Sequence, residues 1–179
     1  ELESRELRFV RYADDFDIFV KSERSADRVM ASVSRWLESK LRLKVSATKT
    51  KVVRPTKSVF LGFTFWKSTR GWECRPTDAA KEKLETKVKQ ILVRKRAIAQ
   101  PMSYIFTKLN QVIRGWVNYY HIGSMATYLR DVFGPWLRHK VRVVIVKQWK
   151  KCSIIHKNLL KIKSIIKSRI TDDAIYQAS

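Results

Sequence analysis

The spacing of apolar residues changes near residue 76, and this change limits the folds open to the chain. Before it, short runs rich in Phe, Val and Ile alternate in part with polar residues, as in "FDIFV" at 16–20, which is typical of strands. After it, apolar residues recur every three or four positions, which is typical of amphipathic helices. The sequence therefore predicts an α+β fold in which an antiparallel sheet with one helix precedes an all-helical region.

The first 76 residues predict the order strand, strand, helix, strand, strand, strand. Two short strands are expected within 7–21. Ser25 is expected to cap a helix that ends near Leu41, because the apolar residues that follow it have helical spacing. The other three strands are expected at 41–53, around a Ser-Ala-Thr turn, at 58–67 and at 71–77.

The residues from 77 to 179 predict a series of helices. Thr77 is a suitable N-cap for the first, and Ser103, after Pro101, for the second. A third is expected to begin at Gly123-Ser124 and to bend or break near Gly134-Pro135, because proline removes a helix hydrogen bond. Further helices are expected to the end. The inner face of the second helix is expected to hold Ile105, Phe106, Leu109, Val112, Ile113, Trp116, Val117 and Tyr120.

The chain is strongly basic, with 38 Lys and Arg against 16 Asp and Glu, a net charge of +22. The excess is uneven, since residues 86–170 contain 19 basic side chains and a single acid, Asp131. Such an excess indicates a polyanionic partner, and nucleic acid is the first candidate. A basic membrane-surface helix is the rival interpretation, but the charges are spread over several segments and no apolar run approaches the length of a membrane span.

Two further features concern the chain as a whole. Cys74 and Cys152 lie far apart and fit no metal-ligand spacing, so we expect unengaged thiols in a reducing compartment. The chain begins at Glu1, without a methionine and just before its most informative motif. We therefore expect it to be a fragment of a longer protein.

Two adjacent carboxylates, Asp14 and Asp15, stand between the first two predicted strands. If strand alternation continued through them, Tyr12 and Asp14 would share one face and Ala13 and Asp15 the other. Twist near a hairpin tip can still turn both carboxylates toward one hard cation such as Mg²⁺. The alternatives are an ordinary turn, in which Asp bonds the nearby backbone, or pairing with Lys or Arg.

Here the residues resemble a known family. The stretch "FVRYADDFDIFVKS" resembles the catalytic hairpin of reverse transcriptases, whose signature is Tyr-Ala-Asp-Asp before an apolar strand. In order along the chain, "RVMASVSRWLESKLRLKVSATKTKVV" resembles the next palm helix and its Lys-Thr-Lys turn, and "FLGFTFW" the strand that grips the primer. "LNQVIRGWVNYYHIGSM", "WLRHKV" and "VKQWKK" resemble the maturase-specific thumb of group II intron reverse transcriptases. The ordered set, more than any single motif, carries the resemblance.

The resemblance implies a C-terminal palm portion at 1–76 and a helical, RNA-binding thumb at 77–179. Asp14 would bridge two magnesium ions, Asp15 would support the second ion or orient its neighbour, and Lys49 would protonate the pyrophosphate. The implied partners are template or intron RNA, a DNA primer and deoxynucleoside triphosphates. The residues that would contact primer or template around these groups are Tyr12, Ala13, Phe60, Leu61, Gly62 and Phe63.

For several of these residues a structural interpretation stays open. Lys49 can be a solvated lysine, Ala13 a core residue, and Gly62 the site of a strand bulge with Phe60, Leu61 and Phe63 in the core. In the helical region, Arg114, Asn118 and Tyr119 lie off the apolar stripe and could face a duplex. Lys147, Trp149, Lys150 and Lys151 combine aromatic and basic groups, which suits stacking and phosphate contact.

The sequence also departs from the family pattern. A palm of this family takes another metal-binding aspartate from an earlier strand, but only glutamates precede the hairpin, and the fingers are absent. We therefore expect this chain alone not to polymerise. Asp17 replaces a usual apolar residue and receives no role. His121, His139 and His156 are isolated, which favours structural or surface positions. An RNA-binding maturase module with idle aspartates is the alternative function, and the thumb motifs argue against a retron or defence enzyme.

Overall fold

The computed structural model describes residues 2–46, 48–162 and 166. The chain divides into two compact units, Glu1–Phe65 and Trp66–Ser179, and each is described by itself. Within the described residues, strands are confined to the sequence before residue 77 and long helices dominate after it, so the predicted α+β fold class is confirmed. The predicted functional boundary between residues 76 and 77 stays a prediction.

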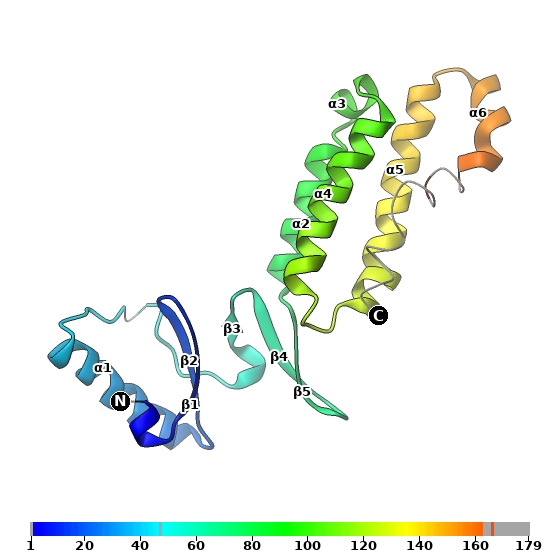
Figure 1. Cartoon of the computed structure of the whole chain (residues 1–179). Helices are drawn as coiled ribbons and strands as arrows, with labels where there is room; N and C mark the ends of the chain where they lie inside the picture. The colour runs from blue at the N-terminus through cyan, green and yellow to red at the C-terminus, as the bar shows by residue number, and fades with distance from the viewer. Residues whose placement is uncertain (1, 47, 163–165, 167–179) are drawn as a thin grey trace. The chain divides into compact units, whose positions relative to one another are not determined.

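After a short 3₁₀ turn (Glu3–Arg5), the first unit forms a tight antiparallel hairpin of β1 (Arg8–Tyr12) and β2 (Asp15–Phe19) (Figure 1). The last pair of the register joins Tyr12 to Asp15, so only Ala13 and Asp14 form the turn. The two predicted strands are confirmed. The prediction that strand alternation continues through the aspartates is wrong, because Asp14 belongs to the turn and the cross-strand partners Tyr12 and Asp15 share a face.

Helix α1 (Glu23–Lys40) follows the hairpin. Its N-cap is Ser22, whose hydroxyl accepts a hydrogen bond from the backbone N–H of Ser25 at 3.3 Å. The predicted cap at Ser25 is therefore wrong, because Ser25 occupies the position that donates to the cap. The predicted end near Leu41 is confirmed, and Val33 is the buried residue of the apolar stripe.

The strand predicted at 41–53 does not form in the described residues of that segment. Leu41 and Leu43 are exposed, and the backbone N–H groups of Lys49 and Thr50 both donate to the carbonyl of Ser46. A strand needs a neighbouring strand to satisfy its backbone, and the described residues provide none here. Thr48 and Lys49, at the start of the polar Lys-Thr-Lys segment, lie in a turn instead.

The single strand predicted at 58–67 is two strands. β3 (Val59–Phe60) pairs antiparallel with β4 (Phe63–Ser68), and Phe60 stands opposite Phe63. The two residues between them, Leu61 and Gly62, have φ of 51° and 80°, which suits the primed turns that match strand twist. β5 (Gly71–Pro76) follows a second two-residue turn, and the sheet order is β3-β4-β5.

In the second unit, α2 (Asp78–Ile91) is capped by Thr77, whose hydroxyl accepts from the N–H of Ala80 at 3.2 Å, as predicted. α4 (Met102–Tyr120) begins directly after Pro101, without a side-chain cap. The predicted cap at Ser103 is therefore wrong, because the helix already begins at Met102 and Ser103 is its second residue. The short α3 (Arg94–Ala99) was not predicted.

The third predicted helix begins at residue 126, later than the predicted Gly123-Ser124, which lie in a turn segment. It contains a π-helical stretch, Tyr128–Phe133, that continues directly into α5 (Gly134–Trp149). The helix runs through Gly134-Pro135 without interruption, so the predicted break is wrong, because Pro135 stands in the first turn of α5, where proline is tolerated. The alternative of a bend at this point stays a prediction. Helix α6 (Cys152–Asn158) and a 3₁₀ turn (Leu159–Lys161) follow. The helices predicted after residue 166 lie outside the described residues.

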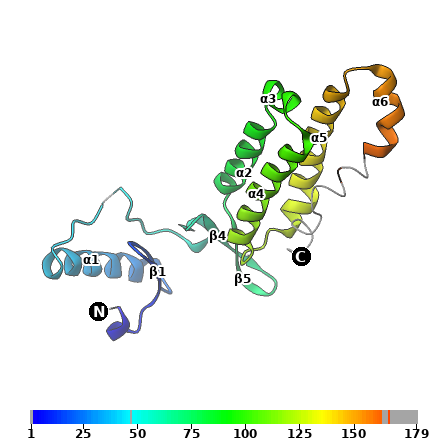
Figure 2. The same ribbon diagram turned by 45° about the horizontal axis from the view of Figure 1, so that its top comes forward.

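The core of the second unit lies between its helices. α2 lies against α4 and α3 against α5, as both views of the ribbon show (Figures 1 and 2). No described helix is long and apolar enough to cross a membrane. The most deeply buried core side chains are Leu84, Val88, Ile105, Leu109, Ile113, Leu129, Phe133, Leu137 and Val141.

Candidate catalytic hairpin and nucleic-acid interface

The tip of the β1–β2 hairpin presents two neighbouring carboxylates to solvent. Asp14 and Asp15 are both exposed, and neither makes a side-chain hydrogen bond or ion pair within the described residues. The nearest cation by sequence, Arg11, donates from Nε to the carbonyl of Ala13 at 2.9 Å. Because that guanidinium is bonded to the backbone, the carboxylates of the tip keep their oxygen atoms available for another cation.

The oxygen atoms of these carboxylates are suitable ligands for magnesium, but two carboxylates form only part of a ligand set. Mg²⁺ takes oxygen ligands, commonly one or two carboxylates completed by substrate phosphates and water. Among the described residues no three His, Cys, Asp or Glu side chains cluster closely enough to hold a metal ion. The tip can therefore contribute two ligands to a site, and the remaining ligands have to come from substrate, water or other residues.

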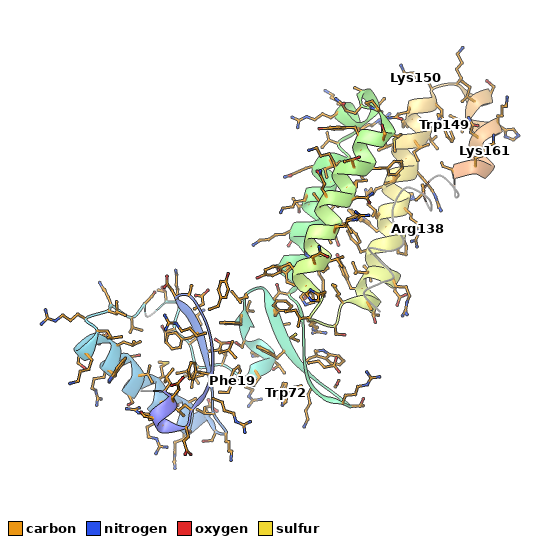
Figure 3. All side chains as sticks on the ribbon, viewed as in Figure 1. Phe19, Trp72, Arg138, Trp149, Lys150 and Lys161 are labelled. Carbon is orange, nitrogen blue, oxygen red and sulfur yellow. The ribbon has the colours of Figure 1, made fainter. Side chains whose placement is uncertain are left out.

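Asp17, which the sequence left without a role, anchors the hairpin. Its carboxylate is half-buried and accepts a hydrogen bond from the Ser58 hydroxyl at 2.9 Å, just before β3. Two residues on, Phe19 meets Phe65 edge to face with ring centroids 6.2 Å apart (Figure 3). An acidic residue inside an apolar strand was the signal that could have revealed this contact.

The other predicted residues of the first unit lie on turns or at the strand ends beside them. Lys49 is exposed on the turn that Ser46 closes, and no hydrogen bond or ion pair joins its side chain to the hairpin within the described residues. Leu61 and Gly62 form the tip of the β3–β4 hairpin, so the alternative of a strand bulge at Gly62 is wrong. Phe60 and Phe63 flank that tip and are half-buried.

The predicted division of α4 into a buried and an exposed face is confirmed. Arg114, Asn118 and Tyr119 are exposed, whereas Trp116 and Tyr120 are half-buried against the core. The indole N–H of Trp116 donates to the carbonyl of Ala80 at 3.2 Å, and its ring lies 4.7 Å from that of Tyr120. The nucleic-acid contacts assigned to the exposed residues stay a prediction.

The basic and aromatic cluster at the end of α5 has a mixed environment. Lys147, Lys150 and Lys151 are exposed, whereas Trp149 is half-buried and packs against the helical core (Figure 3). Lys147 also lines a small cleft of about 180 Å³ together with Arg94 and Lys140. This packing favours a structural role for the Trp149 ring and leaves the lysines free to face an anion.

Three acids of the helical unit, Asp78, Glu85 and Asp131, pair with neighbouring cations, Glu85 with Lys89 at 3.6 Å. Lys81 bonds the carboxylate of Asp78 at 2.8 Å and lowers its pKa, and Arg130 does the same to Asp131 at 2.7 Å. Glu85 accepts from the Tyr128 hydroxyl at 3.3 Å. Because these acids are locally compensated, they do little to offset the positive potential of the remaining basic side chains.

Two family models match this sequence. Residues 1–65 match the model described as reverse transcriptase (RNA-dependent DNA polymerase), and residues 81–170, just over half of the chain, match the group II intron maturase-specific domain. The chain belongs to the group II intron reverse transcriptase and maturase family. A comparison with curated proteins found none that matches.

The two matches coincide with the two kinds of structure. In this group II intron reverse transcriptase, the aspartate hairpin lies within the polymerase match, and the maturase-specific match begins inside α2 and includes α4 and α5. Together they indicate a reverse transcriptase with a role in intron splicing, whose partners are nucleic acids. The resemblance inferred from the motifs is thereby confirmed.

Proposed function

We propose that Asp14 and Asp15 are the metal-binding carboxylates of RNA-directed DNA synthesis, with Mg²⁺ as the metal and deoxynucleoside triphosphates as substrates. The observation that carries this proposal is the hairpin tip, where two exposed carboxylates lie inside the reverse transcriptase match and have no side-chain partner among the described residues. A template RNA and a DNA primer complete the set of partners. We place the protein in a reducing compartment, bacterial cytoplasm or an organelle.

Each residue of the hairpin has a task in this proposal. The short turn and the pairing of Tyr12 with Asp15 fix where the carboxylates project, and the bond between Asp17 and Ser58 holds the hairpin against β3. Bound magnesium would lower the pKa of the primer hydroxyl and offset the charge that develops on the triphosphate. The Lys49 ammonium would donate a proton to the departing pyrophosphate, which as general acid catalysis is worth roughly 10²–10⁴ in rate.

The remaining parts of the proposal concern binding. The β3–β4 tip, with Gly62 lacking a side chain, would lie against the primer backbone, and residues 77–179 would bind intron RNA or the template duplex. Because two carboxylates form an incomplete ligand set, we propose that these 179 residues do not polymerise by themselves. The missing ligand and the fingers would come from an upstream segment of the protein.

The test is primer extension by a polymerase-competent protein that carries this sequence. Asp14→Asn keeps the shape of the side chain and removes its charge, so extension on poly(rA) with an oligo(dT) primer should fall by at least 10²-fold, while RNA affinity stays unchanged. Asp27→Asn, on the exposed face of α1, is the matched control and should extend normally. Extension near the wild-type rate by Asp14→Asn would refute the metal assignment and favour an RNA-binding module with idle aspartates.

A further inference from the structure

An open groove of about 540 Å³ runs between α2 and α4, the two helices that lie side by side in Figures 1 and 2. A volume of this order is in the range of pockets that hold a small ligand. One side carries Lys83 and Lys87 from α2, and the other carries Gln111, Gly115, Trp116 and Tyr119 from α4.

The two lysines make the groove attractive to anions. Lys83 and Lys87 are exposed, stand one helical turn apart, and form no ion pair within the described residues. Like charges at this spacing destabilise a helix by a few tenths of a kcal/mol. A phosphate bound between them would relieve the repulsion.

The aromatic wall is fixed before any ligand arrives. Trp116 is held by its hydrogen bond to the Ala80 carbonyl, and its ring lies against that of Tyr120. The ring of Tyr119 meets Tyr120 at 76° with centroids 4.7 Å apart, and Tyr119 remains 51% exposed. Rings held in this way offer stacking surface at little cost in conformational entropy.

Gly115 adds an independent observation. It lies in the interior of α4, where glycine is less favourable than alanine by about 1 kcal/mol. A Cβ built there meets no atom within 4 Å, so packing does not require glycine. Because Gly115 has no side chain, the floor of the groove is uncovered there, one helical turn from both Gln111 and Tyr119.

We propose that this groove, referred to below as the α2–α4 groove, binds unpaired nucleotides of RNA. Bases would stack on the aromatic wall above Gly115, phosphates would lie on Lys83 and Lys87, and Gln111 would bond a base edge. A duplex hides the faces of its bases, whereas a loop or bulge exposes them, so the aromatic wall favours unpaired RNA. The inference rests on the proposed RNA binding of the helical region and assigns its substrate class.

Two pairs of variants distinguish RNA binding in the groove from general electrostatic attraction to the basic surface. Gly115→Gln fills the floor, and Ser103→Gln, at an exposed position of α4 that does not line the groove, is its control. Lys83→Glu with Lys87→Glu reverses the charge of the groove. Lys95→Glu with Lys157→Glu, both exposed and neither lining the groove, makes the same change of net charge elsewhere in the unit.

The measurement is the affinity of the full 179-residue chain for two fluorescent RNA hairpins that are identical except for a bulge of three unpaired nucleotides. The wild type and both controls should prefer the bulged RNA by about tenfold, in line with the worth of one stacked base. Gly115→Gln and the Lys83/Lys87 pair should lose that preference. A bulge carrying 4-thiouridine should crosslink to the peptide that contains Trp116 and Tyr119.

Other outcomes decide against the groove in different ways. If the wild type binds both hairpins equally, or if the groove and control pairs weaken both hairpins to the same extent, the groove is no site while the proposed RNA binding stands. If polyglutamate displaces both RNAs at equal charge concentration, the groove suits an acidic protein instead. If the wild type binds neither hairpin, the proposed RNA binding itself fails.

Discussion

At the scale of single residues, the hairpin tip depends on a backbone conformation that most side chains avoid. Ala13 has φ of 50°, in the left-handed region, directly before Asp14. A residue with a Cβ is strained there by roughly 1–2 kcal/mol, and a β-branched residue by more. The small side chain at position 13 thus permits the two-residue turn that projects both carboxylates, in addition to any room it leaves for nucleic acid.

This strain gives a residue-scale prediction. Ala13→Gly should leave the stability of the hairpin within about 0.5 kcal/mol of wild type, since relief of strain and greater freedom of the unfolded chain nearly cancel. Ala13→Val should cost about 2 kcal/mol or more. Hydrogen exchange of the peptide covering β1 and β2 measures both. Equal protection in Ala13→Val and wild type would mean that the turn is not left-handed at this residue.

At the scale of elements, the sequence predicted those that carry a strong local signal. The long amphipathic helices and the cap at Thr77 were predicted, because periodicity and capping act within a few residues. The prediction of a strand at 41–53 was wrong because a strand depends on a partner strand elsewhere in the chain. The six residues of α3 are too few to show a period, and the turn at Leu61-Gly62 was read as continuous strand because "FLGF" stays apolar.

Two helical glycines have opposite roles, which gives a prediction at this scale. A Cβ at Gly134 would lie 2.8 Å from the Leu129 carbonyl oxygen, where the π-helix passes into α5, whereas a Cβ at Gly115 meets nothing within 4 Å. Gly134→Ala should therefore destabilise the chain by about 1–3 kcal/mol. Gly115→Ala should stabilise it by up to about 1 kcal/mol. Urea unfolding compares them, and the same sign for both would contradict this account.

The π-helical segment also predicts a pH dependence. Burial of the Tyr128 phenol raises its pKa above the usual value, and the neighbouring Glu85 carboxylate raises this pKa further. The neutral phenol is thus favoured in the folded state, so its contribution to stability is present below pH of about 10 and is lost as pH rises toward the folded pKa.

Tyr128→Phe tests this dependence. It should cost about 1 kcal/mol at pH 7.5, because the bond to Glu85 is lost. In urea unfolding at pH 10.5 or above, the difference between variant and wild type should shrink, since phenylalanine cannot ionise. If both proteins lose the same stability over this range, ionisation of Tyr128 is not linked to unfolding.

At the scale of the whole molecule, charge and motif order predicted more than local pattern did. The excess of basic residues indicated a nucleic-acid partner, and the ordered motifs indicated the family that both family models support. The α2–α4 groove could not be predicted from the sequence, since Lys83 and Gly115 become neighbours only when the two helices pack. The exposed aspartates were predicted from the signature, but the anchoring of Asp17 by Ser58 was not, because it joins residues 41 positions apart.

The last prediction follows from the nineteen basic side chains and one acid between residues 86 and 170. Each phosphate neutralised adds about 0.9 to the slope of log affinity against log salt for a B-form duplex, and about 0.7 for a single strand. If a third to a half of these groups touch phosphate, affinity for RNA should fall by about 10³-fold or more between 50 and 200 mM salt. Single charge reversals at Arg114, Lys147 or Lys150, all exposed, should weaken every RNA by a similar factor and lower the slope. A salt titration of the full chain against an RNA duplex and a structured RNA measures both effects, with an uncharged nucleic-acid analogue as the control. A flat salt response would mean that the basic surface faces another kind of partner, of which an acidic protein fits the charge best.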